Sequence, residues 1–213
     1  MGIQGDEAGA GPAESADEKV SPRPPPATIG PGREAPTTSG AGQKAMERAL
    51  MGVCVAAILF LCVQILMFGY GRDQGIYAMV ADAILRGKMP YRDAWDFKPP
   101  GIFVVYGVSR LFFGPSQVGI RVLEVAGLLA TCAALVRLSE RFFRSRVAGF
   151  LAAALAVLAH AQLDFWHTAQ PESFGGFLTV FAILLAARTP EEPVASKRAV
   201  YLAGVLFGLT GLL

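Results

Sequence analysis

The sequence has little charge and few residues of the kinds that build disulfide or metal frameworks. Of its 213 residues, 17% are charged and 53% are hydrophobic, which is too apolar a balance for an ordinary soluble domain. The net charge of +2 gives no basis for predicting a nucleic-acid partner. We expect no disulfide framework, because every cysteine lies inside an apolar run, where it acts as a small core residue. The cysteines are Cys54, Cys62 and Cys132.

Several catalytic motifs are also missing. The two histidines cannot make a zinc site without carboxylates, and no metal-ligand spacing is present. The sequence has no glycine-rich nucleotide loop, and Ser173 lacks the flanking residues of a nucleophile elbow. We therefore assign no metal ligands, and we predict neither a nucleotide-binding loop nor a serine hydrolase.

The first 44 residues differ in kind from the rest. They are rich in Gly, Pro, Ala and Ser, so they bury too little apolar surface to offset the entropy of ordering. We expect residues 1–44 to form a disordered cytoplasmic tail. This tail is no signal peptide, because a long polar stretch precedes the first apolar run. Myristoylation is not expected either, since Asp6 stands where the signal needs Ser or Thr.

Beyond the tail, apolar runs alternate with polar connections, which predicts an all-α, polytopic transmembrane protein. The run from Ala49 to Tyr70 has about 22 residues, enough for a helix to cross roughly 30 Å of hydrocarbon. Lys44 and Arg48 flank its start, so the positive-inside rule puts the N-terminus in the cytoplasm. Because the chain stops inside its last apolar run, we expect the domain 45–213 to be incomplete. The predicted spans lie near residues 49–70, 118–136, 147–163, 173–187 and 199–213.

The side of each loop follows from one short segment. The run from Gly101 to Gly114 has about 14 residues, which is typical of an interfacial segment rather than of a span. If it does not cross, the arginine-rich segment Arg137–Arg146 is cytoplasmic, as the positive-inside rule requires. Loops 73–98 and 164–172 then share the outer side. The aromatic residues expected at the outer interface are Phe103, Tyr106, Phe112 and Phe113.

The outer loop 71–117 holds most of the candidate chemistry. Apolar residues recur at helical spacing after Asp73, which predicts an amphipathic helix on the membrane surface that stops near Gly87. Asp73 is either the N-cap of this helix, a functional carboxylate, or both. Lys98 precedes two prolines that stiffen its backbone, so it is either a fixed cation for a lipid phosphate or a lysine that snorkels.

The second outer loop adds a carboxylate and an imidazole. Glu172 lies at the start of a short helix, and a carboxylate at membrane depth indicates function because its burial is costly. His167 is open to three interpretations: a ligand, a base or a surface residue. Asp164 and Trp166 are more typical of a membrane interface than of a site.

These motifs together resemble one class of membrane enzymes. An Asp-led amphipathic helix with a tyrosine four residues on, the box Trp95-Asp-Phe-Lys-Pro-Pro-Gly101, an end at Leu111-Phe-Phe-Gly114 and the following Val118-Gly-Ile-Arg121 are similar to GT-C glycosyltransferases. Within that class the resemblance is to the protein-mannosyltransferase-like group, which comprises glycosyltransferase family 39 and the aminoarabinose transferase of lipid A. It covers Arg72 to about Ala187, and Gln170-Pro-Glu172 falls at the second acidic motif.

The resemblance implies inverting transfer of a sugar from a polyprenyl-phosphate donor to a lipid, glycan or protein acceptor, on the extracytoplasmic face of the cell membrane. It makes Asp73 the general base or acceptor-orienting carboxylate, Glu172 the second acidic residue, and Lys98 the cation near the donor phosphate. Two departures are present: Gln74 stands where the group often has glutamate, and Asp96 lies two residues before Lys98 rather than adjacent. A divalent cation stays open. The other candidate substrate-binding residues are Tyr77, Asp96, Arg72 and His167.

Two other functions are compatible with the sequence. The chain is alternatively a truncated, non-catalytic membrane protein or subunit that uses the outer loop to bind lipid or a partner. A transporter segment ranks last, because the charges gather in loops rather than in the middle of the predicted helices.

Overall fold

A computed structural model describes residues 39–213, without the side chains of Ser39 and Phe165. Most of the predicted tail, residues 1–38, therefore lies outside the described residues. Residues 39–44 were wrongly assigned to that tail, because the first helix begins at Ser39. The same helix runs from Ser39 through the charged residues Lys44, Glu47 and Arg48 into the first apolar run.

The described residues form seven α-helices, one short 3₁₀ helix and no β-strand, which confirms the all-α prediction for this part of the chain. Each predicted apolar run corresponds to a helix. The elements are α1 (Ser39–Leu66), α2 (Arg72–Leu85), α3 (Pro100–Phe113), α4 (Gln117–Phe143), α5 (Arg146–Gln162), η1 (Asp164–Trp166), α6 (Pro171–Ala186) and α7 (Lys197–Thr210).

Two helices differ in extent from the apolar runs of the sequence. Helix α1 stops at Leu66 rather than Tyr70, and the non-helical carbonyls of Phe68 and Gly69 instead accept hydrogen bonds from a buried arginine. Helix α4 continues past Val136 through most of the arginine-rich segment. Basic residues are compatible with the last turns of a helix, where they interact favourably with the helix dipole.

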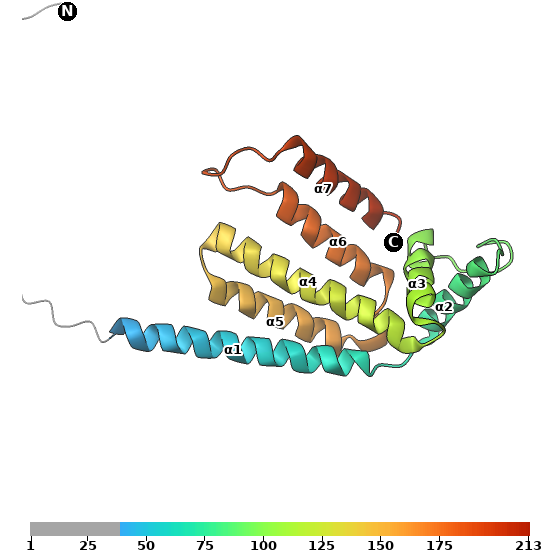
Figure 1. The fold of residues 1–213 in the computed structure, drawn as a ribbon, viewed down its shortest axis with the longest axis horizontal. Helices are drawn as coiled ribbons and strands as arrows, with labels where there is room; N and C mark the ends of the chain where they lie inside the picture. The colour runs from blue at the N-terminus through green and yellow to red at the C-terminus, as the bar shows by residue number, and fades with distance from the viewer. Residues whose placement is uncertain (1–38) are drawn as a thin grey trace, which may run out of the picture. The chain divides into compact units, whose positions relative to one another are not determined.

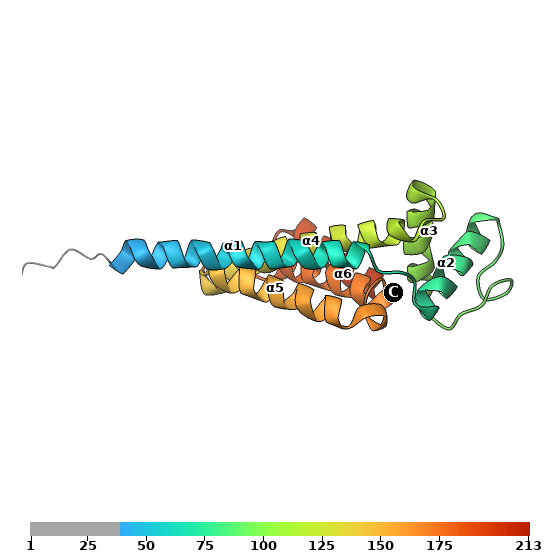
Figure 2. The ribbon, with the colours of Figure 1, turned by 90° about the horizontal axis from the view of Figure 1, so that it is seen from below.

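Helices α1, α4, α5, α6 and α7 run alongside one another, and α2 and α3 lie at one end of this bundle (Figures 1 and 2). The loops 67–71 and 163–170 and the first turn of α6 are at that same end. The connection between α4 and α5 and the connection between α6 and α7 lie at the opposite end. The predicted outer loops therefore meet at one end of the bundle, and the arginine-rich segment lies at the other.

The described helices bury two apolar clusters. One fills the space between α1, α4, α5 and α6 and includes Ile65, Leu128, Val157 and Phe177. The other joins α2, α3 and α4 at the end of the bundle that carries the predicted outer loops. Both clusters follow from the apolar faces of the helices, because burial of that surface is the main favourable term in folding.

The second cluster corrects one prediction about the aromatic residues of α3. Phe103 and Tyr106 are buried against Tyr77 of α2, with ring centroids 6.2 and 5.6 Å away. Because they are one turn apart, they lie on the face of α3 that packs on α2. They therefore do not face the outer membrane interface, contrary to our prediction. Phe112 and Phe113, further along α3, are exposed.

Two helices are long and apolar enough to cross a membrane. They cover Gly40–Leu66, with mean hydropathy 2.7, and Gln117–Phe143, with mean hydropathy 1.8. Three shorter helices, α3, α5 and α6, are also apolar. The cysteines of α1 and α4 are buried and free, as the sequence predicted.

Candidate active site

An ion pair joins the two predicted outer loops. The Lys98 ammonium lies 2.9 Å from Oε1 of Glu172, although the two residues are 74 positions apart. Lys98 immediately precedes the two prolines that begin α3, and Glu172 is the second residue of α6. The predicted cation and the predicted second carboxylate are therefore direct neighbours.

Local contacts hold the backbone of Lys98. Its N–H donates to Oδ1 of the buried Asp96 at 2.9 Å, and its carbonyl accepts from the Tyr91 hydroxyl at 2.9 Å. Pro99 is the N-cap of α3 and Pro100 occupies its first turn, where proline is favoured. Asp96 thus orients the lysine through the main chain. The substrate contact predicted for Asp96 stays a prediction.

Glu172 lies where a helix favours negative charge. Pro171 opens α6 and leaves Glu172 in the first turn, close to the positive end of the helix dipole. Partial burial acts to raise the pKa of the Glu172 carboxyl. The hydrogen bonds from Lys98 and from the Glu172 backbone, together with the charges of Lys98 and His167, outweigh that effect, so the pKa is lowered. Glu172 is therefore an anion at neutral pH.

Asp73 and Tyr77 approach the same region from α2. Asp73 is in the first turn of the helix, with its side chain 33% exposed, but Gly71 rather than Asp73 is the N-cap. Tyr77, one turn further on, is buried and donates to the side chain of Gln170 at 3.0 Å. Carboxylates from three segments of the chain act on the Tyr77 hydroxyl, and their negative charges influence whether it keeps its proton.

The Tyr77 phenol stays protonated. Burial raises its pKa first, and the negative charges of the neighbouring carboxylates raise it further. A neutral phenol in this place acts as a hydrogen-bond donor and not as a base. The carboxylates concerned are Asp73, Asp96 and Glu172.

Two predicted site residues have different surroundings. Arg72 is 88% exposed, and among the described residues its side chain pairs only with its neighbour Asp73, at 3.4 Å. His167 is half-buried, with its ring 4.9 Å from that of His160. Burial and the nearby His160 lower the pKa of His167, although Glu172 and Glu124 act in the opposite direction.

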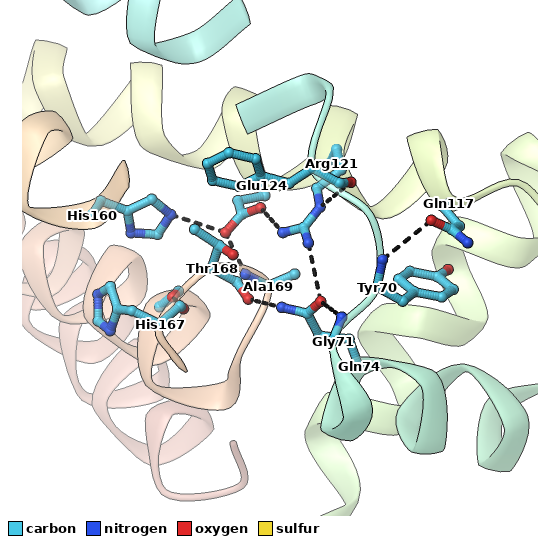
Figure 3. Close-up of polar contacts among 12 residues, drawn as sticks. Tyr70, Gly71, Gln74, Gln117, Arg121, Glu124, His160, His167, Thr168 and Ala169 are labelled. Carbon is cyan, nitrogen blue, oxygen red and sulfur yellow. Dashed lines mark hydrogen bonds and ion pairs between the residues drawn. The ribbon is translucent and has the colours of Figure 1, made fainter. Parts of the chain in front are cut away.

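A buried polar network is centred on Arg121 and Glu124 of α4 (Figure 3). Arg121 donates to Glu124 at 2.9 Å, to Gln74 at 3.0 Å and to the carbonyl of Gly69 at 2.7 Å. Gln74 in turn donates to the Thr168 carbonyl. The network therefore ties the loop after α1, the start of α2 and the loop before α6 to helix α4.

Glu124 completes the network on the other side. Its Oε1 accepts from the backbone N–H of Ala169 and lies 2.9 Å from Nε2 of His160 (Figure 3). Arg121, Glu124 and Gln74 have no exposed surface, and His160 is 4% exposed. Burial of charged groups is tolerated only when they are paired and hydrogen-bonded, as they are here.

Sequence reasoning found only part of this network. Arg121 was named at the end of a motif in the family resemblance, and Gln74 as a departure from it. Glu124 and His160 were not identified as members of a buried network. A usable signal was present, because ionisable residues inside apolar runs are costly and usually paired. No group of three or more His, Cys, Asp or Glu side chains within the described residues is arranged to hold a metal ion.

Comparisons with known proteins add no family to this description. No protein-family model matches the chain, and no match is found among curated proteins or solved structures.

Proposed function

We propose that this chain is a GT-C glycosyltransferase that transfers a sugar from a polyprenyl-phosphate donor to an acceptor at the outer face of the cell membrane. The observation that carries the proposal is the ion pair between Lys98 and Glu172. This ion pair joins the Lys-Pro-Pro motif of one loop to the acidic motif of the other. The charges of Asp73, Asp96 and Glu172 all raise the pKa of the buried Tyr77 phenol, so the three carboxylates are near one another.

Placement in a membrane is part of this proposal. Helices α1 and α4 have the length and hydropathy of spans, and many large apolar side chains of α1 are exposed to the surroundings of the bundle. Lipid would cover those side chains. The exposed aromatic residues at the site end, including Trp95, Phe97 and Trp166, are suited to a membrane interface. The arginine-rich segment at the other end supports a cytoplasmic side there.

The proposed chemistry is a single displacement at the anomeric carbon. Asp73 accepts the proton of the acceptor hydroxyl while that oxygen forms the new bond to the anomeric carbon. The bond from that carbon to the phosphate oxygen breaks with its electron pair, and polyprenyl phosphate leaves. Lys98 stabilises the negative charge that develops on the departing phosphate.

The Lys98–Glu172 pair is compatible with such a role because it is partly exposed. The side chains are 21% and 58% exposed, and ion pairs near water contribute little net stability. A donor phosphate can therefore replace Glu172 as the partner of the Lys98 ammonium at small energetic cost. Before the donor binds, Glu172 holds the ammonium in place. Helix α6 supplies the fixed position of Glu172 through Pro171.

A non-catalytic membrane protein that binds lipid or a partner is the second candidate. It is favoured by the pairing of the site charges with each other, since Arg72 also contacts Asp73. A transporter segment has less support, because Arg121, Glu124 and His160 all lie near the ends of α4 and α5 beside the loops.

The test is a transfer assay in membranes from cells that express the gene at its natural length, supplied with polyprenyl-phosphate-linked hexoses. Asp73→Asn should lower the rate by about a hundredfold or more, the usual contribution of a general base. Asp93→Asn is the matched control, since that carboxylate pairs with Arg92 on the surface. If Asp73→Asn transfers sugar as fast as the wild type, the assignment of Asp73 as the base is refuted. If neither the wild type nor any variant transfers sugar, the non-catalytic membrane protein is favoured.

A further inference from the structure

The arginine-rich segment at the far end of the bundle is largely neutralised by the protein itself. Arg141 pairs with Glu192 at 3.2 Å, Arg144 with Glu191 at 2.7 Å, and Arg146 with Glu140. These pairs involve three of the four arginines. Each of these ion pairs leaves one arginine less able to bind an anion from outside the protein.

Arg137 is different from the other three. Within residues 39–213 its side chain makes no ion pair and no hydrogen bond to the protein, and it is exposed. A guanidinium beside an apolar surface favours a partner that is both anionic and able to accept two hydrogen bonds, which a phosphate is.

The Arg137 side chain lies at a groove between α1, α4 and α5. The apolar part has a volume of about 330 Å³ and is lined almost entirely by aliphatic, aromatic and cysteine side chains. A second part of about 390 Å³ shares Val55, Val136, Arg137 and Phe150 with the first and adds the paired Glu140 and Arg146. Because the two parts share these residues, they form one groove that changes from apolar to basic along the bundle.

This gradient matches one class of ligand. An acyl chain fits the part lined by Ile58, Leu59 and Cys132, and a phosphate diester fits Arg137 at the polar part. The pair Arg146–Glu140 adds no net charge, so the groove carries the single positive charge of Arg137. A helix from a second protein would need a carboxylate at that level to satisfy the same arginine.

We propose that this groove binds one anionic membrane phospholipid, with an acyl chain between α1, α4 and α5 and its phosphate on Arg137. The site lies at the opposite end of the bundle from the candidate active site. The inference rests on the membrane placement in the proposed function, but it does not depend on sugar transfer. It assigns the unpaired arginine of the cytoplasmic segment to a bound lipid rather than to general surface charge.

The test is native mass spectrometry of the full chain purified in detergent, with phosphatidylglycerol or phosphatidylcholine added. The wild type should retain one phosphatidylglycerol in preference to phosphatidylcholine. Arg137→Gln should weaken phosphatidylglycerol binding about tenfold, the effect of losing one charged hydrogen-bonding partner. Arg144→Gln removes the same charge from an exposed surface pair, and it should bind as the wild type does.

A second variant tests the groove itself. Ala133 lines the apolar part and is exposed, so Ala133→Phe fills the groove without entering the packed core. It should abolish retention of both lipids while the helical content, measured by circular dichroism, stays unchanged. Unchanged binding in this variant, or equal losses in Arg137→Gln and Arg144→Gln, would overturn the proposal.

Three further outcomes separate this proposal from the proposed function. A dimer mass that disappears in Ala133→Phe would show that a second copy covers the groove, and it would overturn lipid binding alone. Recovery of the chain in the soluble fraction after carbonate extraction would overturn the membrane placement and the lipid site together. No sugar transfer by any form, together with preferential phosphatidylglycerol binding by the wild type, would overturn the proposed enzyme activity and support the groove assignment.

Discussion

Arg121 donates a hydrogen bond to Glu124 at 2.9 Å, and neither side chain has any exposed surface. Replacing Arg121 with methionine should lower the free energy of unfolding by about 3–5 kcal/mol, because Glu124 would keep a buried charge without its counterion. Thermal unfolding of the purified protein in detergent measures the change. Arg72→Gln, at an exposed arginine, should shift stability by less than about 0.5 kcal/mol. Equal effects of the two changes would contradict a structural role for the buried pair.

Gly149 is where α5 packs closely on α4. A Cβ atom built on Gly149 would lie 2.7 Å from Cα of Val136 and 3.0 Å from Cβ of Ser139. Gly149→Ala should therefore destabilise the protein by about 1–3 kcal/mol, because backbone atoms cannot move aside as a flexible side chain can. Gly52→Ala is the control in α1, where a Cβ meets open space, and it should stabilise the helix by about 1 kcal/mol. Stabilisation by both changes would mean that the two helices are not in close contact.

The half-buried His167 should make stability depend on pH. Because burial and His160 lower its pKa from 6.5, the unfolded chain takes up a proton before the folded chain does. The contribution of neutral His167 is thus complete above pH 6.5 and is lost as the pH falls through the lowered pKa. The melting temperature of His167→Gln should therefore depend less on pH between pH 7 and pH 5 than that of the wild type. Glu172 and Glu124, the carboxylates that act on His167, are present in both proteins. A wild-type melting temperature that rises on acidification would contradict this sign.

The Tyr77 hydroxyl offers a test of the link between α2 and the loop before α6. Tyr77→Phe should cost about 1–2 kcal/mol, because it removes a buried hydrogen bond to Gln170 while leaving the packing of the ring in place. The matched control is Tyr201→Phe in α7, where the tyrosine is 72% exposed. Chemical denaturation in detergent compares the two. No difference between them would mean that the hydroxyl contributes nothing to the folded state.

Local signals in the sequence predicted several features of this fold. The helix after Asp73 and its stop near Gly87 follow from apolar spacing and from a glycine at φ +77°, a conformation that costs glycine little. The two prolines after Lys98 predicted a stiff backbone at that residue, because proline fixes its own backbone and restricts the preceding residue, and they lie at the start of α3. Each of these signals depends only on residues close together in the chain.

Long-range contacts were harder to predict. Gln74 and Thr168 are 94 positions apart, and nothing in the local sequence of either residue indicates the other. The same is true of Lys98 and Glu172, for which a family resemblance suggested roles but no contact. The predicted placement of Phe103 and Tyr106 at the membrane interface was wrong for a related reason. An aromatic residue suits the contact between two helices as well as it suits a membrane interface.

The claim on which both proposals depend is that the bundle crosses a membrane with the two site loops on one side. The most direct test is labelling of intact cells with a membrane-impermeant maleimide, using Lys88→Cys in the loop after α2 and Val194→Cys in the exposed connection after α6. The native cysteines are buried, so the parent chain gives the background. The account predicts that Lys88→Cys is labelled in intact cells and that Val194→Cys is labelled only after the membrane is opened. Labelling of both in intact cells, or of neither until the membrane is opened, would contradict it.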